Sequence, residues 1–217
     1  MAAGGKAAAA YAQIERMIVM RDLTPGMLVS EALVMERTGL GRTPVREALQ
    51  QLARHRMVEI HPSKGVLIPP ISVEDQLRML EMRRALEVLA VRLACARVGV
   101  AEEHEIRALA STLEHSDFSL QQYAETVKET HDLVARTAHN DYVASALAPV
   151  QVLSRRFWLA HVIDETAEVR SGRRLHLDIL SAILRREPDA AQEASHALND
   201  YLIDFAYAVL RRTHQVP

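Results

Sequence analysis

The stretch LGRTPVREALQQL, residues 40–52, decides the fold of the first part of the chain. Apolar residues recur in it at positions i, i+3, i+4 and i+7, the spacing of one buried face on an amphipathic helix. Pro44 falls in the first turn, where its missing N–H removes no helical hydrogen bond. The apolar face is Val45, Ala48, Leu49 and Leu52, and the polar face is Arg42, Thr43, Arg46 and Gln50.

The segments on either side of this helix define its structural context. Thr24-Pro25-Gly26 interrupts an earlier helical pattern, and Ser30 is a good N-cap for a second, short helix. After the third helix, two short strand-like runs flank a turn that contains Lys64. We therefore expect helices over residues 8–21, 30–37 and 42–55, a tight turn over 38–41, and strands over 57–60 and 66–69.

Helix, turn, helix and a basic-tipped hairpin, in this order, form a winged helix-turn-helix. The second helix of such a motif lies in the major groove of DNA with its N-terminal residues on base edges. An arginine matches the N7 and O6 acceptors of guanine, and a lysine at the wing tip reaches the phosphate backbone or the minor groove. Without this context, two arginines four residues apart would indicate no more than a solvated surface. The predicted DNA-binding residues are Arg42, Thr43, Arg46, Gln50, Ser63, Lys64 and Gly65.

The distribution of charge supports DNA binding, although the whole chain carries a formal net charge of −2. Residues 1–72 contain nine Lys and Arg against six Asp and Glu, whereas the remainder has an excess of acidic residues. Six of the nine basic residues fall between Arg37 and Lys64. Such a concentrated basic stretch is typical of a nucleic-acid-binding domain.

Residues 40–52 closely resemble the recognition helix of the GntR family of bacterial regulators. Thr24-Pro25-Gly26 and the wing residues 62–66 match that family at the expected distances, so the resemblance covers about residues 8–70. It implies a transcriptional regulator, usually a repressor, that binds a short palindromic operator in double-stranded DNA as a homodimer. Two positions depart from the pattern: Gly41 replaces a hydroxyl residue, and Ala32 stands where some relatives place an arginine on DNA.

From Ser72 onward the chain has the helical period throughout and shows no strand signal. Ser72 with Asp75 resembles a capping box that opens a helix extending to about Val98. Short loops between successive helices predict an antiparallel bundle. The expected fold is therefore mainly α, with a winged helix-turn-helix over 1–71 and an all-α antiparallel helical bundle over 72–217. We expect Leu77, Leu80, Leu86, Leu89 and Leu93 on the apolar side of the first helix, and further helices over 101–115, 119–138, 141–161, 166–186 and 189–212.

The helical part resembles the FCD ligand-sensing domain of the FadR subgroup. The resemblance rests on Arg83 followed by Leu86-Glu87, on His131 nine residues before Asn140, and on His176 with Ala182. It implies a pocket for a small effector inside the bundle. Arg83 can hold a carboxylate through two hydrogen bonds, which favours an effector of the carboxylic acid class. The predicted effector-binding residues are Arg83, His131 and His176.

Two features of this pocket stay open from the sequence. His131 lies on an apolar stripe and is equally explained as a buried histidine bonded to a neighbour, while Arg155, Arg156 and Trp158 belong either to the pocket or to a surface or dimer contact. If the histidines pair with an acid, effector binding should tighten as the pH falls towards their ordinary pKa of about 6.5.

The resemblance also raises the question of a metal, because members of this subgroup often bind a divalent ion through one aspartate and three histidines. The position of the aspartate, one turn before His131, is Val127, and the position of the last histidine is Leu198. Two imidazoles are too few for tight zinc binding. No metal cofactor is therefore expected to be required, and His131 with His176 would form at most a weak zinc or nickel site. A tight site would need His161, His196 or Asn199 to complete it.

The remaining classes of protein are disfavoured by the sequence. Charged residues interrupt every apolar stretch before a membrane span is reached, and a lone cysteine, Cys95, fits a cytoplasmic protein. The Ala-rich residues 1–10 are expected to form a disordered tail rather than a signal peptide. The sequence contains neither a phosphate-binding loop nor a nucleophile motif that would indicate an enzyme. The alternative that we retain is a helical-bundle metal-binding protein or enzyme, with the winged helix as a module for interaction with other proteins.

Overall fold

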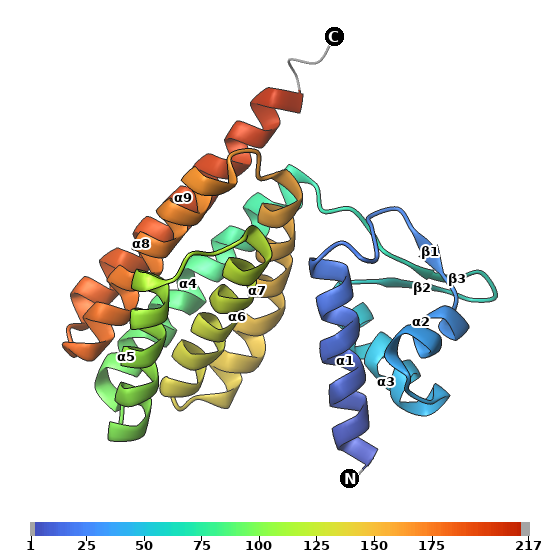
Figure 1. Cartoon of the computed structure of the whole chain (residues 1–217), viewed down its shortest axis with the longest axis horizontal. Helices are drawn as coiled ribbons and strands as arrows, with labels where there is room; N and C mark the ends of the chain where they lie inside the picture. The colour runs from blue at the N-terminus through green and yellow to red at the C-terminus, as the bar shows by residue number, and fades with distance from the viewer. Residues whose placement is uncertain (1–2, 214–217) are drawn as a thin grey trace. The chain divides into compact units, whose positions relative to one another are not determined.

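The computed structural model of the chain describes residues 3–213, which form two compact units that meet in sequence between Ile71 and Ser72. Figure 1 shows a first unit that combines helices with a small sheet and a second unit built of helices. The mainly helical fold class expected from the sequence is confirmed.

The first unit is a winged helix-turn-helix. Its strands form one antiparallel sheet in the order β1-β3-β2, with Val66 paired to Val29 on one side and to Ile60 on the other. The apolar face expected on the third helix is buried, and Ile14 and Ile18 of the first helix belong to the same core. The elements are α1 (Ala3–Val19), β1 (Leu28–Val29), α2 (Glu31–Thr38), α3 (Arg42–Arg54), β2 (Glu59–His61) and β3 (Gly65–Leu67).

The helix-turn-helix itself is fixed by its caps. The Ser30 hydroxyl accepts a hydrogen bond from the backbone N–H of Leu33, as an N-cap should. Gly39 ends α2 with φ of 64°, a left-handed conformation that glycine adopts at little cost. Gly41 caps α3 without any side-chain hydrogen bond, which leaves the start of this helix open towards solvent.

Two expectations about the first unit were wrong in detail, and one strand was missed. Helix α1 begins at Ala3, so residues 3–10 are helical rather than a disordered tail, in keeping with the high helix propensity of alanine. Met57 and Val58 are buried ahead of the first wing strand, which begins only at Glu59. Strand β1 was not expected, because two residues are too short to show an alternating pattern.

The second unit is a helical bundle in which α4 packs against α7 and α9, and α6 packs against α7 (Figure 1). Ser72 caps α4 by accepting a hydrogen bond from the N–H of Asp75. Within residues 3–213, none of the helices combines the length and the apolar character needed to cross a bilayer. The helices are α4 (Val73–Arg97), α5 (Val100–His115), α6 (Leu120–Thr137), α7 (Asp141–His161), α8 (Glu165–Leu184) and α9 (Pro188–Thr213).

Helix α4 buries only part of the leucine face expected from its sequence, with Leu86 and Leu93 packed against the core. Leu80 is buried, but Leu89 is 44% exposed. The buried face combines apolar residues with polar side chains, including Arg83 and Glu87, which are 2% and 5% exposed. These two residues place charged groups inside the bundle.

Candidate functional site: a DNA-reading helix and a polar cavity

The exposed face of α3 brings together the residues predicted to read DNA. Arg42, Thr43, Arg46 and Gln50 are all exposed, opposite the buried face of the same helix. The open N-terminus of α3 adds backbone N–H groups and a partial positive charge, which favour a phosphate group there. This surface can therefore bind the backbone of DNA and present side chains to base edges.

Arg46 makes an ion pair that the sequence did not reveal. Its Nε lies 2.8 and 3.0 Å from the two carboxylate oxygens of Glu31, at the start of α2. The pair is exposed, so it adds little to stability. The ion pair instead positions the Arg46 guanidinium, because it engages Nε and leaves the Nη groups for an acceptor on a base.

The wing is a tight hairpin between β2 and β3. Ser63 and Lys64 are exposed at its tip, where Ser63 has φ of 61°. Gly65 has φ of 123°, and a Cβ at this position would lie 2.6 Å from the carbonyl oxygen of Val29. Gly65 therefore has a structural reason to be glycine: it allows the wing to close on β1.

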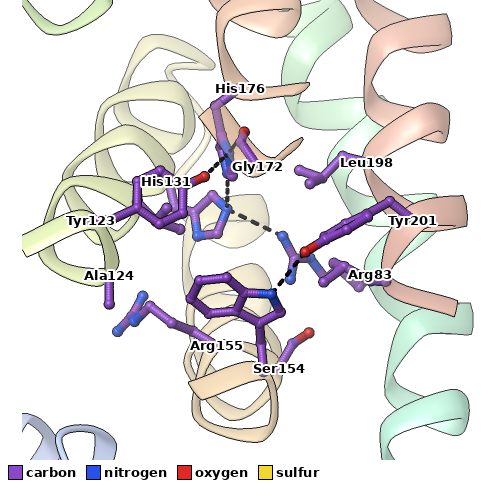
Figure 2. Close-up of a pocket in the computed structure, with 13 residues that line it drawn as sticks. Arg83, Tyr123, Ala124, His131, Ser154, Arg155, Gly172, His176, Leu198 and Tyr201 are labelled. Atoms are coloured by element: carbon purple, nitrogen blue, oxygen red, sulfur yellow. Dashed lines mark hydrogen bonds between the residues drawn. The ribbon is translucent and has the colours of Figure 1, made fainter. Parts of the chain in front are cut away.

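The second unit contains a partly open cavity between α4, α6, α7, α8 and α9 (Figure 2). It offers about 40 Å³ to the centres of water molecules. The three predicted effector-binding residues all line it, as do Arg155 and Trp158, whereas Arg156 is buried outside the lining. The lining residues are Arg83, Tyr123, Ala124, Val127, His131, Ser154, Arg155, Trp158, Gly172, His176, Leu198, Tyr201 and Leu202.

Close polar contacts join the predicted effector-binding residues (Figure 2). Arg83 Nη2 lies 3.2 Å from His131 Nε2, which faces His176 Nε2 at 3.4 Å. Because a carbonyl only accepts, His176 Nδ1 donates to the Gly172 carbonyl at 2.7 Å. Tyr123 Oη lies 3.1 Å from the same nitrogen. Gly172 allows this approach, since a Cβ there would collide with the Tyr123 hydroxyl.

The protonation of His131 follows from its partners. Arg83 can only donate, so Nε2 of a neutral His131 accepts and the proton lies on Nδ1. This Nδ1 is buried and has no hydrogen-bond partner. Burial lowers the pKa of His131 well below its ordinary value, and Arg83 and Arg155 lower it further. Burial also lowers the pKa of His176 to about 4. Both imidazoles are therefore neutral at pH 6.5 in the ligand-free protein, and the pH dependence expected for effector binding stays a prediction.

Glu87 holds Arg83 in place from the other side. Its Oε1 accepts from Arg83 Nε at 2.9 Å and from Gln151 Nε2 at 3.0 Å, and its Oε2 accepts from Asn199 Nδ2 at 2.7 Å. The sequence indicated Glu87 only as part of a signature. The sequence carries no signal for Gln151 or Asn199, because a single buried amide side chain leaves no periodic pattern.

The residues present do not fit a tightly bound metal. Val127 and Leu198 line the cavity beside His131 and His176, so the register inferred for the four positions is consistent with the structure. Zinc sites need three or four ligands, and the Arg83 guanidinium already occupies the lone pair of His131 Nε2. His161, His196 and Asn199 are outside the lining, and Asn199 is bonded to Glu87. Across the part of the chain that the structure describes, no group of three His, Cys, Asp or Glu side chains is placed to hold a metal.

Comparisons with known proteins agree with both units. Residues 6–68 match the gntR family of bacterial regulatory proteins, and residues 78–200 match the FCD domain. The chain is 26% identical over 197 residues to the HTH-type transcriptional repressor GlaR of Escherichia coli K12, with 84% of this chain and 87% of GlaR covered. It is 28% identical over 177 residues to the Nta operon transcriptional regulator of Aminobacter aminovorans, with 80% and 81% covered.

The solved structure of E. coli McbR/YncC shares the fold, with a TM-score of 0.76 at 18% identity over 97% of this chain and 99% of that one. The relatives are transcriptional regulators and not enzymes. The chain belongs to the GntR family of bacterial transcriptional regulators, and its FCD domain fits the FadR subgroup.

Proposed function

We propose that this regulator is a cytoplasmic repressor that binds a short palindromic operator as a homodimer and is released by a small carboxylic acid. The observation that carries the proposal is the cavity of the FCD domain, in which Arg83, His131 and His176 converge. A regulator that needed no effector would gain more stability from an apolar core at this place than from buried charges.

The DNA-binding part of the proposal rests on the exposed face of α3 and on the wing. Arg42 and Arg46 are presented at or near the open N-terminus of a helix, and Lys64 is exposed at the hairpin tip. Relatives that align over most of this chain are named repressors, which supports repression here.

The homodimer follows from the size of the recognition surface. One recognition helix reaches only a few base pairs, so specificity in a genome requires two helices on a two-fold operator. We expect light scattering to give the mass of a dimer at micromolar concentration. A monomer at this concentration, with full operator affinity, would contradict the proposal.

The acidic effector is inferred from the charges and donors around the cavity. Arg83 and Arg155 both line the cavity. At neutral pH the two histidines are uncharged, so the positive charge at the cavity comes from the arginines. We propose that no metal cofactor is needed, because the arginines supply the positive charge that a metal supplies elsewhere.

The test is an operator-binding experiment. An operator is selected from random DNA with the full-length protein, and its affinity is measured by fluorescence anisotropy with and without a broad panel of metabolites. We expect affinity for the operator to fall steeply with salt, and at least one carboxylic acid to weaken it. Failure to select any DNA sequence, or an operator affinity that no small molecule changes, would refute the proposed function.

A further inference from the structure

Two side chains of the DNA-binding unit form an ion pair between neighbouring helices, α2 and α3 (Figure 1). Oε1 and Oε2 of Glu31 lie 3.0 and 2.8 Å from Nε of Arg46, the residue expected to contact a base. The side chains of Glu31 and Arg46 are 35% and 56% exposed, so solvent reaches the pair and it adds little to the free energy of unfolding. Stability alone therefore does not account for the pair.

The position of Glu31 in α2 does not account for the pair either. Glu31 lies in the first turn of α2, directly after the Ser30 cap, where a carboxylate is favourable next to the positive end of the helix. That preference would be satisfied equally well without Arg46. Contact with Arg46, 15 positions later in the chain, depends instead on the packing of α2 against α3.

The pair determines which donors Arg46 offers to DNA. A guanidinium carries five N–H groups in one plane, and Glu31 accepts from the one on Nε. The two Nη groups remain, and together they match the O6 and N7 acceptors at the major-groove edge of guanine. Arg46 therefore meets DNA with its guanidinium already held in one orientation, which lowers the entropy lost when this long side chain is ordered on a base.

The same contact keeps Arg46 from the phosphates of DNA. An unpaired arginine binds phosphate oxygens in any sequence, and such contacts supply most of the affinity for non-specific DNA. The Glu31 carboxylate cancels the charge of Arg46 at long range and repels a phosphate that approaches the pair. Hydrogen bonds to guanine are short-range and need only the Nη groups, so the pair weakens non-specific contacts more than specific ones.

We propose that Glu31 is a positioning residue that determines specificity: it holds the Nη groups of Arg46 for the guanine of one G·C base pair and withholds them from phosphates. Removal of this carboxylate strengthens binding to random DNA while it weakens discrimination among base pairs. The inference rests on the proposed function, in which Arg46 reads a base, and it adds a residue that controls this reading without touching DNA itself.

Fluorescence anisotropy with the full-length protein tests the inference. Arg46→Ala first locates the base pair that Arg46 reads, because it should lose discrimination at one position of the selected operator. Duplexes with each of the four base pairs at that position, and a random-sequence duplex, are then titrated with the parent and with Glu31→Gln. In Glu31→Gln, discrimination in favour of G·C should fall at least about fivefold. Its affinity for random DNA should rise roughly three- to tenfold at about 50 mM salt and should fall more steeply as salt is added.

Further variants separate positioning from charge and from folding. Glu36→Gln removes the same charge from an exposed position five residues further along α2, and its discrimination should match the parent's. Glu31→Asp keeps the charge on a side chain one methylene shorter, so it should lose discrimination while its affinity for random DNA rises less than that of Glu31→Gln. Addition of Glu31→Gln to Arg46→Ala should change discrimination no further than Arg46→Ala alone. Circular dichroism of each variant establishes that it folds.

The outcomes separate this inference from the proposed function. The inference is overturned by unchanged discrimination in Glu31→Gln, by an affinity for random DNA that does not rise in this variant, or by an equal loss of discrimination in Glu36→Gln. An effect of Glu31→Gln that persists beside Arg46→Ala also overturns it, because Glu31 would then contact DNA by itself. In these cases a selected operator whose affinity responds to a metabolite leaves the proposed function standing. If Arg46→Ala loses discrimination at no position, Arg46 does not read a base, and that part of the proposed function fails together with the inference.

Discussion

The buried imidazole of His176 predicts that the helical domain loses stability as the pH falls below neutral. Its pKa is lowered from 6.5 to about 4 by burial, so the unfolded chain binds a proton in a pH range where the folded chain does not. Stability from this group is therefore fully present above pH 6.5 and is lost as the pH falls towards 4. The groups around the imidazole that act on this balance are Tyr123, His131, Arg83 and Glu87.

The size of the effect follows from the difference between the two pKa values. One pKa unit corresponds to about 1.4 kcal/mol, so the complete shift is worth about 3 kcal/mol, of which about 2 kcal/mol is lost between pH 7 and pH 5. The lowered pKa of His131 adds to the loss in the same direction. For a bundle of this size, such a change is a substantial fraction of the free energy of unfolding.

Urea unfolding at pH 7 and pH 5, followed by circular dichroism, measures this loss. His176→Gln removes the titrating group, so its free energy of unfolding should fall less over this range than that of the parent, by about 2 kcal/mol. His104→Gln serves as the control because His104 is exposed on α5, and its pH dependence should match the parent's. Equal pH dependence in the parent and His176→Gln would show that the imidazole is not buried in its neutral form.

Five substitutions test other parts of the structure. Arg46→Ala should cost about 1–3 kcal/mol of operator binding and relax specificity at one base pair. Lys64→Ala should instead weaken binding to all DNA sequences evenly and reduce the slope of log affinity against log salt concentration by about 1. Anisotropy titrations across operator variants distinguish the two. Glu31→Gln should change the free energy of unfolding by less than about 1 kcal/mol, yet lower base discrimination at the position that Arg46 reads. Unchanged discrimination would refute the idea that Glu31 positions Arg46. Gly172→Ala should lower the free energy of unfolding by about 1–3 kcal/mol through overpacking against Tyr123, and adding Tyr123→Phe should restore part of it.

The elements that the sequence predicted best are those with strong local signals. The spacing of apolar residues in α3 identified its buried face, and Ser30 identified the start of α2 through its cap. Helix α4 shows the limit of this reasoning, because its leucines gave no signal that Gln76, Arg83 and Glu87 are buried as well. Which face of a helix is buried depends on what the neighbouring helices offer, and that information lies elsewhere in the chain.

The cavity could be anticipated only in part. The resemblance to the FCD domain implied that Val127, His131, His176 and Leu198 belong together, and they do line one cavity. The pairing of Arg46 with Glu31 and the two amide bonds to Glu87 were not predictable, since each joins residues at least 15 positions apart.

The polar interior of the helical domain lowers its stability, and we attribute this loss to the binding of the proposed effector. A buried ion pair such as Arg83–Glu87 is often no more stabilising than apolar residues of the same volume, because both charges must be desolvated. Here the pair is embedded in further hydrogen bonds, and its geometry fixes the His131 tautomer that leaves an unpartnered N–H in the cavity. A purely apolar core would lack that donor. The same network therefore accounts for the burial of Arg83 and Glu87 on α4.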